Sequence, residues 1–310
     1  MKLLLTLSLL ILSTTARADV TLPKLFSPHM VLQRNMPIHI WGDAAPGEQI
    51  TVDFHGATAS TTADNLHRWS IYLPAQPAGG PFTLTIHGQN TVTLDDILIG
   101  DLWLASGQSN MEMPLGGFNS AAVIKDSAKE VAAANHPQIR LLQIKKDSAD
   151  YPLEDFKAVA GWSLCTPDSA KTFSAAAYFF GRDLQQKENV PIGLIDSTWG
   201  GSPAEAWTSM DALGADASLI SVFAARANHM DLETTQQRID LVNKQARAEH
   251  KPAIPSPEYH PDQLSWRPAG LCNAMIAPSP RSPSAESSGT RANPTPLSTA
   301  PPNTPASSPP

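Results

Sequence analysis

Charged residues are scarce in this 310-residue chain: Asp, Glu, Lys and Arg together make up 16% of it, and the net charge is −7. No long run of Lys or Arg occurs, whereas a protein that binds a nucleic-acid backbone needs a clustered basic face. We therefore exclude nucleic acid as a partner. The apolar share of 42% lies in the globular range, and the length allows two ordinary domains.

Cysteine is also scarce, since Cys165 and Cys272 are the only two in the sequence. An oxidising compartment would permit a bridge between them, but two buried thiols fit the sequence at least as well. No group of Cys and His residues has the spacing of a zinc site, so we expect no structural metal.

Long apolar runs are absent except at the start of the chain. Lys2, the apolar stretch 3–12 and the small-x-small pattern at 16–18 predict a signal peptide over residues 1–18, cleaved near Ala18. The stretch is too short to span a bilayer, and the alternative interpretation is a buried amino-terminal helix. We expect a periplasmic or secreted protein with no membrane span after cleavage.

Short alternating stretches, separated by Gly and Pro, fill the sequence from residue 19 to residue 94. Apolar and polar residues alternate at 50–54, 69–73 and 82–86, with many β-branched and aromatic side chains. This pattern is typical of antiparallel strands. We therefore predict a small all-β sandwich domain over residues 19–94.

The pattern changes at residue 95. Residues 97–105 form a nearly continuous apolar run, which is typical of a strand buried on both faces of a parallel sheet. Helix-like and strand-like stretches then alternate, so we predict an α/β fold with a parallel sheet and flanking helices over residues 95–278. The expected helices are 120–134, 175–187 with Ser174 as cap, 202–207 and 233–250, and the expected strands are 139–144 and 191–197.

The last segment, residues 279–310, is dominated by Ser, Pro and Thr, and Leu297 is its only large aliphatic residue. Such a segment cannot bury enough apolar area to offset the entropy of ordering, so we expect it to be disordered. One interpretation is a natural linker or stalk, and another is given below.

Ser109 follows the buried strand that is predicted at 97–105. Gly107 permits a sharp turn, which would expose the Ser109 hydroxyl and direct nearby backbone N–H groups toward a reacting carbonyl. Most Gly-x-Ser turns, however, are ordinary connections. Met111 also stands where the nucleophile elbow of α/β hydrolases has glycine.

Gly200 and Gly201 follow the second buried strand. In the residues that follow these glycines, Ser202 and Glu205 have the spacing of a capping box, and Pro203 suits the first position of a helix. Free N–H groups and a positive helix end would converge there, which favours an oxyanion donor. The alternative is a plain glycine turn before a well-capped helix.

These two motifs resemble two sequence blocks of bacterial sialate O-acetylesterases, which are Ser-Gly-Asn-His hydrolases. The matching segments are residues 30–34, 100–112, 173–182, 192–207 and 268–278, so the resemblance spans about residues 20–278. It implies that Ser109 is the nucleophile and that backbone N–H groups of Ser109 and of Gly200 or Gly201 form the oxyanion hole. It further implies hydrolysis of O-acetylated sialic acid through an acyl-enzyme, without a metal or organic cofactor.

Two blocks of this family are missing from the sequence: Gly-Glu-Ser-Asn, which adds an Asn to the oxyanion hole, and Asp-x-x-His, which supplies the general base. The match stops at Pro278. When one base is restored after that codon, one permitted set of codons for residues 279–295 encodes a further apolar strand that ends in Gly-Glu-Ser-Asn. We therefore hypothesise a one-base deletion or a sequencing error there, and the nucleotide sequence tests this.

The missing histidine block has a direct chemical consequence. Ser109 would lack a general base, so we expect little or no esterase activity from this chain. A sheet truncated at Pro278 would also leave an unpaired edge and apolar surface exposed. Histidines elsewhere in this part of the chain are expected to have surface or structural roles; they are His136, His229, His250 and His260.

Two other functions are compatible with the sequence. The same fold and nucleophile serve acetylated xylan or another polysaccharide equally well, because a fold does not determine the substrate. The second is a non-catalytic, secreted carbohydrate-binding protein built on the β-sandwich. Trp41, Trp69 and Trp162 would then stack on sugars, although such tryptophans are more often core residues.

Overall fold

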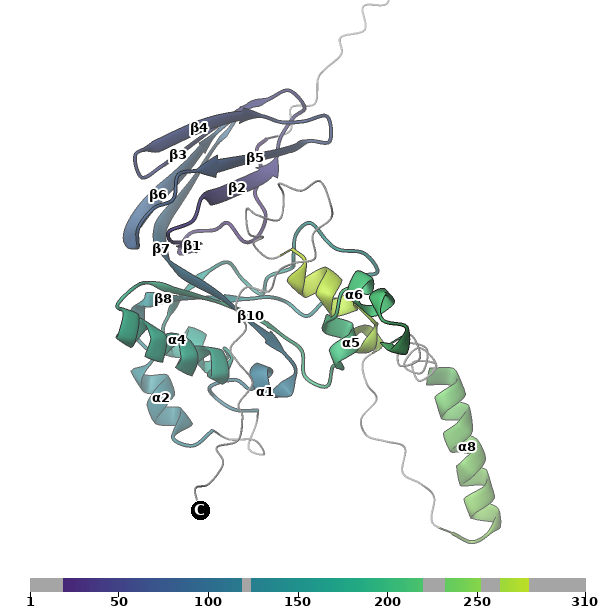
Figure 1. The fold of residues 1–310 in the computed structure, drawn as a ribbon. Coiled ribbons are helices and arrows are strands. Elements are labelled where there is room, and N and C mark those ends of the chain that lie inside the picture. Colours follow the sequence, from purple (N-terminus) through teal and green to yellow (C-terminus); the bar gives the residue numbers. More distant parts are fainter. Residues whose placement is uncertain (1–18, 119–123, 220–231, 252–262, 279–310) are drawn as a thin grey trace, which may run out of the picture.

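The computed structural model describes four ranges of the chain, namely residues 19–118, 124–219, 232–251 and 263–278 (Figure 1). The predicted signal peptide and the Ser/Pro/Thr-rich segment lie outside these ranges, as do His229 and His260. Within the described ranges, no helix is both long and apolar enough to cross a bilayer.

A β-sandwich forms the amino-terminal part of the molecule (Figure 1). Its strands are β1 (Val31–Gln33), β2 (Ile38–Asp43), β3 (Gln49–Phe54), β4 (Ala57–Thr62), β5 (Arg68–Leu73), β6 (Gly79–His87) and the first part of β7 (Thr91–Gly107). One layer has the order β4-β3-β6-β7 with β1 on β7, and the other is the antiparallel pair β2–β5. Trp69, Ile71 and Leu73 of β5 are buried while their neighbours are exposed, so the predicted alternation is present.

The α/β part follows in the chain. Its strands are the second part of β7, β8 (His136–Gln143), β9 (Ser163–Cys165) and β10 (Ile192–Thr198). β10 lies between β7 and β8 and is parallel to both, whereas β9 is antiparallel at the edge. The helices are α1 (Ser109–Glu112), α2 (Ser127–Ala133), α3 (Pro167–Lys171), α4 (Ala175–Glu188), α5 (Ala204–Trp207), α6 (Met210–Ala215), α8 (Leu232–Ala248), α9 (Gln263–Trp266) and the π-helix η1 (Cys272–Ile276).

One strand belongs to both parts. β7 has 17 residues; its first part pairs antiparallel with β6, and its second part pairs in parallel with β10 from Asp101 onward. The boundary that we predicted after residue 94 therefore falls inside β7. Gly100 lies at the change of partner, where a Cβ would come within 2.0 Å of the Pro191 carbonyl oxygen. Only glycine lets the two backbones approach this closely.

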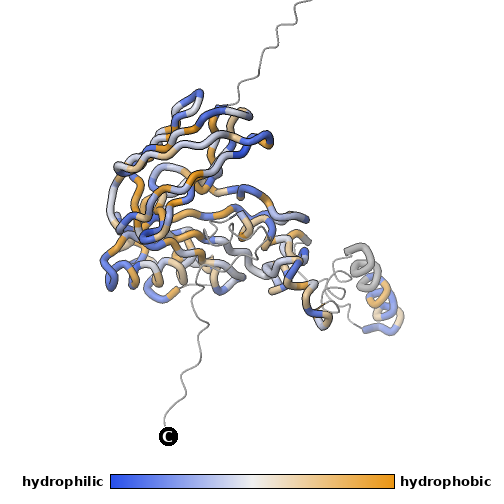
Figure 2. Tube along the Cα trace, turned by 45° about the horizontal axis from the view of Figure 1, so that its top comes forward, coloured by the Kyte–Doolittle hydropathy of each residue, from blue (hydrophilic) through white to orange (hydrophobic). Residues whose placement is uncertain are grey.

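The two faces of the parallel sheet pack against different neighbours. Leu141, Leu194 and Tyr178 of α4 belong to one apolar cluster. Leu142 and Ile195, which alternate with them along β8 and β10, belong to a second cluster that continues into the sandwich. Figure 2 shows hydrophobic stretches along these central strands. The sandwich and one face of the α/β sheet thus share a core.

The segment 30–34, one of the family blocks, fixes β1 against β7. Arg34 makes two hydrogen bonds to the Asp101 carboxylate, at 2.8 and 2.9 Å, and Gln33 accepts one from the backbone N–H of Leu102. This ion pair raises the pKa of Arg34. The block therefore has a structural role at the join between the two parts.

Several local expectations are modified by the structure. The helix predicted at 120–134 is shorter, because Asp126 has left-handed backbone geometry with φ +58° just before α2, and residues 119–123 are not described. Both cysteines are buried free thiols. Burial raises the pKa of the Cys165 thiol to about 11 and also raises that of Cys272.

Candidate active site

Ser109 begins α1, two residues after the end of β7. Gly107 has φ +144°, a backbone conformation that side chains disfavour, and it turns the chain out of the sheet. Ser109 is exposed. Its hydroxyl donates a hydrogen bond to Oε1 of Gln108, and its backbone N–H donates to the same oxygen at 2.9 Å. The Ser109 N–H therefore already has an acceptor on the neighbouring side chain.

The loop after β10 lies beside Ser109. The backbone N–H of Trp199 donates to the Gly107 carbonyl at 3.0 Å and ties the two loops together. A Cβ built on Gly200 would lie 3.5 Å from the Cβ of Ser109. The structure thus brings Ser109 and the Gly200 turn to a common point, as the parallel pairing of β7 and β10 requires.

The N–H of Gly200 is not free, contrary to our expectation, because it donates a hydrogen bond to Oε2 of Glu112. The other oxygen of Glu112 accepts from Nζ of Lys146, which lies 5.9 Å from the centre of the Trp199 ring. The Glu112 carboxylate thus accepts the hydrogen bond that we expected the Gly200 N–H to donate to an oxyanion. Its position shows that this donor can bind negative charge.

Gly201 is placed differently. It has φ +75°, and its carbonyl accepts a hydrogen bond from the Trp266 indole at 2.8 Å. Within the described part of the chain, the N–H of Gly201 has no hydrogen-bond acceptor. Of the two glycines that we proposed as oxyanion donors, Gly201 is therefore the one with an available N–H group.

The helix after these glycines is not capped as predicted. α5 is one turn long, its N-cap is Pro203, and no side chain caps it. The hydroxyl of Ser202 donates to the Trp199 carbonyl at 2.6 Å and accepts from the Trp207 indole at 2.7 Å. The predicted capping box fails because these two contacts use the hydroxyl. A helix dipole consequently contributes little here.

Asp196 lies beneath the site, buried near the end of β10. Its carboxylate accepts hydrogen bonds from the Thr198 hydroxyl at 2.7 Å and from the Gln143 amide at 3.3 Å. Loss of solvent raises the pKa of this carboxyl to about 6, and the nearby charge of Glu112 acts in the same direction, although the hydrogen bonds oppose it.

Sequence reasoning gave no role to Gln108, Glu112, Lys146 or Asp196. The closeness of Glu112 to Ser109 could have been predicted, because Glu112 follows Ser109 by three residues and one helical turn brings such positions together. Lys146 carried none, because its contact with Glu112 spans 34 residues of sequence.

No histidine is hydrogen-bonded to Ser109 in the four described ranges. The hydroxyl of Ser109 bonds to Gln108 alone there. His136 has Nε2 at 3.1 Å from the Tyr178 hydroxyl, and burial lowers the pKa of His136. This contact fits the surface or structural role that we expect for His136, and His250 is exposed.

Comparisons with known proteins agree with the motifs. The model of a family described as "Carbohydrate esterase, sialic acid-specific acetylesterase" matches residues 99–234. Sialate O-acetylesterase of Homo sapiens is 36% identical over 199 residues, which are 58% of this chain and 37% of that protein. The enzyme of Rattus norvegicus is 32% identical over 206 residues, 60% of this chain and 37% of that protein. The chain thus spans little more than a third of the length of these relatives.

A solved structure agrees as well. The crystal structure of a carbohydrate acetylesterase from Xanthomonas citri matches with a TM-score of 0.64 and 32% identity, covering 84% of this chain and 48% of that one. The predicted α/β fold is confirmed by this match. Over residues 99–234, the chain is therefore similar to the sialic acid-specific acetylesterases among the carbohydrate esterases.

Proposed function

We propose that this chain provides the nucleophile and part of the oxyanion site of an ester hydrolase that removes O-acetyl groups from sialic acid or a related sugar. The observation that supports this most strongly is the position of Ser109, exposed at the end of β7 and 3.5 Å from a Cβ built on Gly200. The name of the matched family supports the same reaction class.

The chemistry follows from these positions. The Ser109 oxygen attacks the acetyl carbonyl and loses its proton to a base, the sugar hydroxyl leaves with a proton, and water then hydrolyses the acyl-enzyme to acetate. Backbone N–H groups of Ser109 and of Gly200 or Gly201 would stabilise the negative oxygen. The Ser109 N–H donates to Gln108 and the Gly200 N–H donates to Glu112. Both side chains must therefore move away before these N–H groups can bind a substrate oxygen.

Within the four described ranges, no histidine is hydrogen-bonded to Ser109 to act as its base. An unassisted hydroxyl is a poor nucleophile at neutral pH. We therefore propose little turnover by this chain as it stands. The frameshift hypothesis belongs to the same proposal: coding DNA after the Pro278 codon that cannot encode the alternative frame would refute it.

Secretion is a further part of the proposal. The features of residues 1–18 support it, since they combine a basic start, an apolar run and a small-x-small site. Amino-terminal sequencing of the protein from the periplasm or the culture medium tests this: a mature start near Asp19 is expected, and an intact Met1 in the cytoplasm would contradict it.

Mass spectrometry after prolonged incubation with a serine-reactive phosphonate tests the nucleophile. An adduct on Ser109 is expected in this chain and in the control Ser106→Ala, but not in Ser109→Ala. Aryl acetate turnover is expected near background. An adduct on another serine, with Ser109 unlabelled, would mean that the assignment of the nucleophile is wrong. Turnover that disappears in Ser109→Ala would instead overturn the expectation of low activity.

A further inference from the structure

A row of stacked rings lies on the outer face of the β2–β5 pair. His39 of β2 is opposite Tyr72 of β5, with ring centres 4.3 Å apart and nearly parallel planes at 9°. On its other side, His39 stacks on Trp41 at 4.7 Å. Phe26 lies in a T-shaped arrangement with Trp41, with ring centres 4.6 Å apart, and Trp41 stays partly exposed. The row is thus a firm, partly exposed aromatic surface, whereas Trp69 and Trp162 are buried.

A cavity of about 700 Å³ opens on this row, and we call it the aromatic pocket. Its lining combines His39 and Trp41 of β2 with loop residues 153–155 of the α/β part. Arg68 of β5 links the two parts through an ion pair with Glu154 at 3.0 Å. The volume is that of a pocket for a small organic ligand.

The lining has the chemistry that recognises a sugar ring. An indole face packs against the C–H groups of a pyranose, while carboxylates accept hydrogen bonds from its hydroxyls and a guanidinium donates to them. Lys24 and Arg68 are the basic residues of the lining, and Asp43, Asp64, Glu154 and Asp155 are the acidic ones. This excess of two negative charges disfavours a sialic acid carboxylate and favours a neutral sugar.

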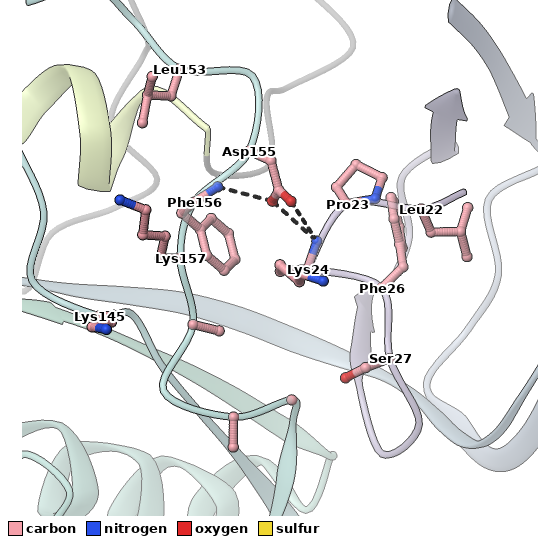
Figure 3. Close-up of a pocket in the computed structure, with 13 residues that line it drawn as sticks. Leu22, Pro23, Lys24, Phe26, Ser27, Lys145, Leu153, Asp155, Phe156 and Lys157 are labelled. Atoms are coloured by element: carbon pink, nitrogen blue, oxygen red, sulfur yellow. Dashed lines mark hydrogen bonds between the residues drawn. The ribbon is translucent and has the colours of Figure 1, made fainter. Parts of the chain in front are cut away.

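A neighbouring cavity has a more basic lining than the aromatic pocket. It measures about 750 Å³ and shares the lining segment 22–24 with the aromatic pocket. Figure 3 shows the residues that line this neighbouring cavity. The Asp155 carboxylate fixes this segment, because it accepts hydrogen bonds from the backbone N–H groups of Lys24 at 3.0 Å and Phe156 at 2.9 Å. Three lysines line this cavity, of which Lys145 and Lys157 are absent from the aromatic pocket.

We propose that the aromatic pocket binds a neutral glycan, with one pyranose ring against Trp41 and with hydroxyls bonded to Arg68 and Asp43. This site is separate from Ser109 and goes beyond the ester hydrolase proposed above. It gives the sandwich a role in holding the polysaccharide or glycoconjugate from which acetyl groups are removed.

Isothermal calorimetry on the full chain tests the proposal, with unbranched hexasaccharides of glucose, xylose and mannose and with sialyllactose as ligands. At least one neutral hexasaccharide is expected to bind more tightly than sialyllactose. Trp41→Ala is expected to weaken that binding about tenfold or more, and Arg68→Gln about threefold. Lys145→Gln, in the neighbouring cavity, and Ser109→Ala are the matched controls and should bind as the unmodified chain does.

Three results would overturn the proposal: no binding of any neutral hexasaccharide at millimolar concentration, tighter binding of sialyllactose, or unchanged binding by folded Trp41→Ala. Circular dichroism checks the fold of each variant. If Trp41→Ala does not fold, the affinity of Arg68→Gln for the neutral hexasaccharide tests the proposal instead, and unchanged binding would overturn it. This variant should fold, because Arg68 and its partner Glu154 are both exposed and the change leaves the core intact. If the phosphonate labels another serine while the neutral glycan still binds, only the assignment of Ser109 as nucleophile is wrong, and the glycan site stands.

Discussion

The two parts of this molecule expose their strands in opposite ways. In the sandwich, β2 and β5 bury one face and present the other, so a row of side chains along the strands is available to a ligand. In the α/β part, every residue of β10 is buried. Only the loops at its strand ends can meet a substrate. Binding chemistry can therefore lie on a sheet face in the first part, whereas reactive groups must lie at strand ends in the second.

The two parts are nevertheless joined by a shared strand and a shared core. This combination predicts that they unfold together, although they use their strands differently. The following predictions test that relation, starting with the change that should destabilise the protein most.

Gly100→Ala should cause the largest loss of stability. The new Cβ would lie 2.0 Å from the Pro191 carbonyl oxygen, at the point where β7 changes partner, so the two backbones must separate. We expect a loss of about 3 kcal/mol or more in the free energy of unfolding. Urea denaturation measures it. Gly214→Ala, in α6, is the control for a glycine with open space around it, and an equal loss there would contradict this explanation.

Ile86→Ala and Leu194→Ala remove fully buried side chains from the sandwich and from the α/β sheet respectively. Each should cost about 2–5 kcal/mol. Because β7 joins the parts, both variants should lower one common transition when tryptophan fluorescence and far-ultraviolet circular dichroism are followed in urea. Two separate transitions, each moved by only one variant, would show that the parts unfold independently.

Asp196→Asn tests the buried carboxyl under the active site. Its pKa is raised from 3.8 to about 6, so the folded protein binds more protons than the unfolded chain between those values. The free energy of unfolding should therefore fall as pH rises from about 4 to 6, by up to roughly 3 kcal/mol. Asp196→Asn cannot ionise and should lack this fall. Urea denaturation at several pH values measures it, with exposed Asp211→Asn as control.

Ser109→Ala should have the smallest effect on stability, within about 0.5 kcal/mol, because Ser109 is exposed and its hydroxyl bonds only to the neighbouring Gln108 in the described chain. A thermal melt measures this. A large loss would mean that the strand-end loop supports the fold as well as carrying the proposed nucleophile.

Much of the fold was predictable because it depends on local periodicity. The alternation at 69–73 and the apolar run before Ser197 correspond to β5 and β10, and Ser174 caps α4 by accepting from the Ala177 N–H. The capping box at Ser202 was not predictable in the same way. Its hydroxyl has two competing partners, one of them the indole of Trp207, and such tertiary contacts override local propensity.

The candidate site was predictable only in part. Motifs placed Ser109 and Gly200 at neighbouring strand ends, and the parallel pairing of β7 and β10 brings them together. The partner of the Gly200 N–H was not predictable, since Glu112 reaches it across 88 residues of sequence. The continuity of β7 was also missed, because the sequence pattern changes at residue 95, inside the strand, whereas its pairing partner changes only near Gly100.

One strand runs from the first part of the molecule into the second, with an irregularity at Asp96, where φ is +57°, and its pairing on both sides limits movement between the two parts. β7 runs for 17 residues, roughly 50 Å if fully extended, from the edge of the sandwich to the turn that carries Ser109. A glycan held on the sandwich would therefore meet the hydroxyl at a fixed spacing. Chain length and the distance between acetylated units, rather than sugar identity alone, would then select which glycans can reach both places at once.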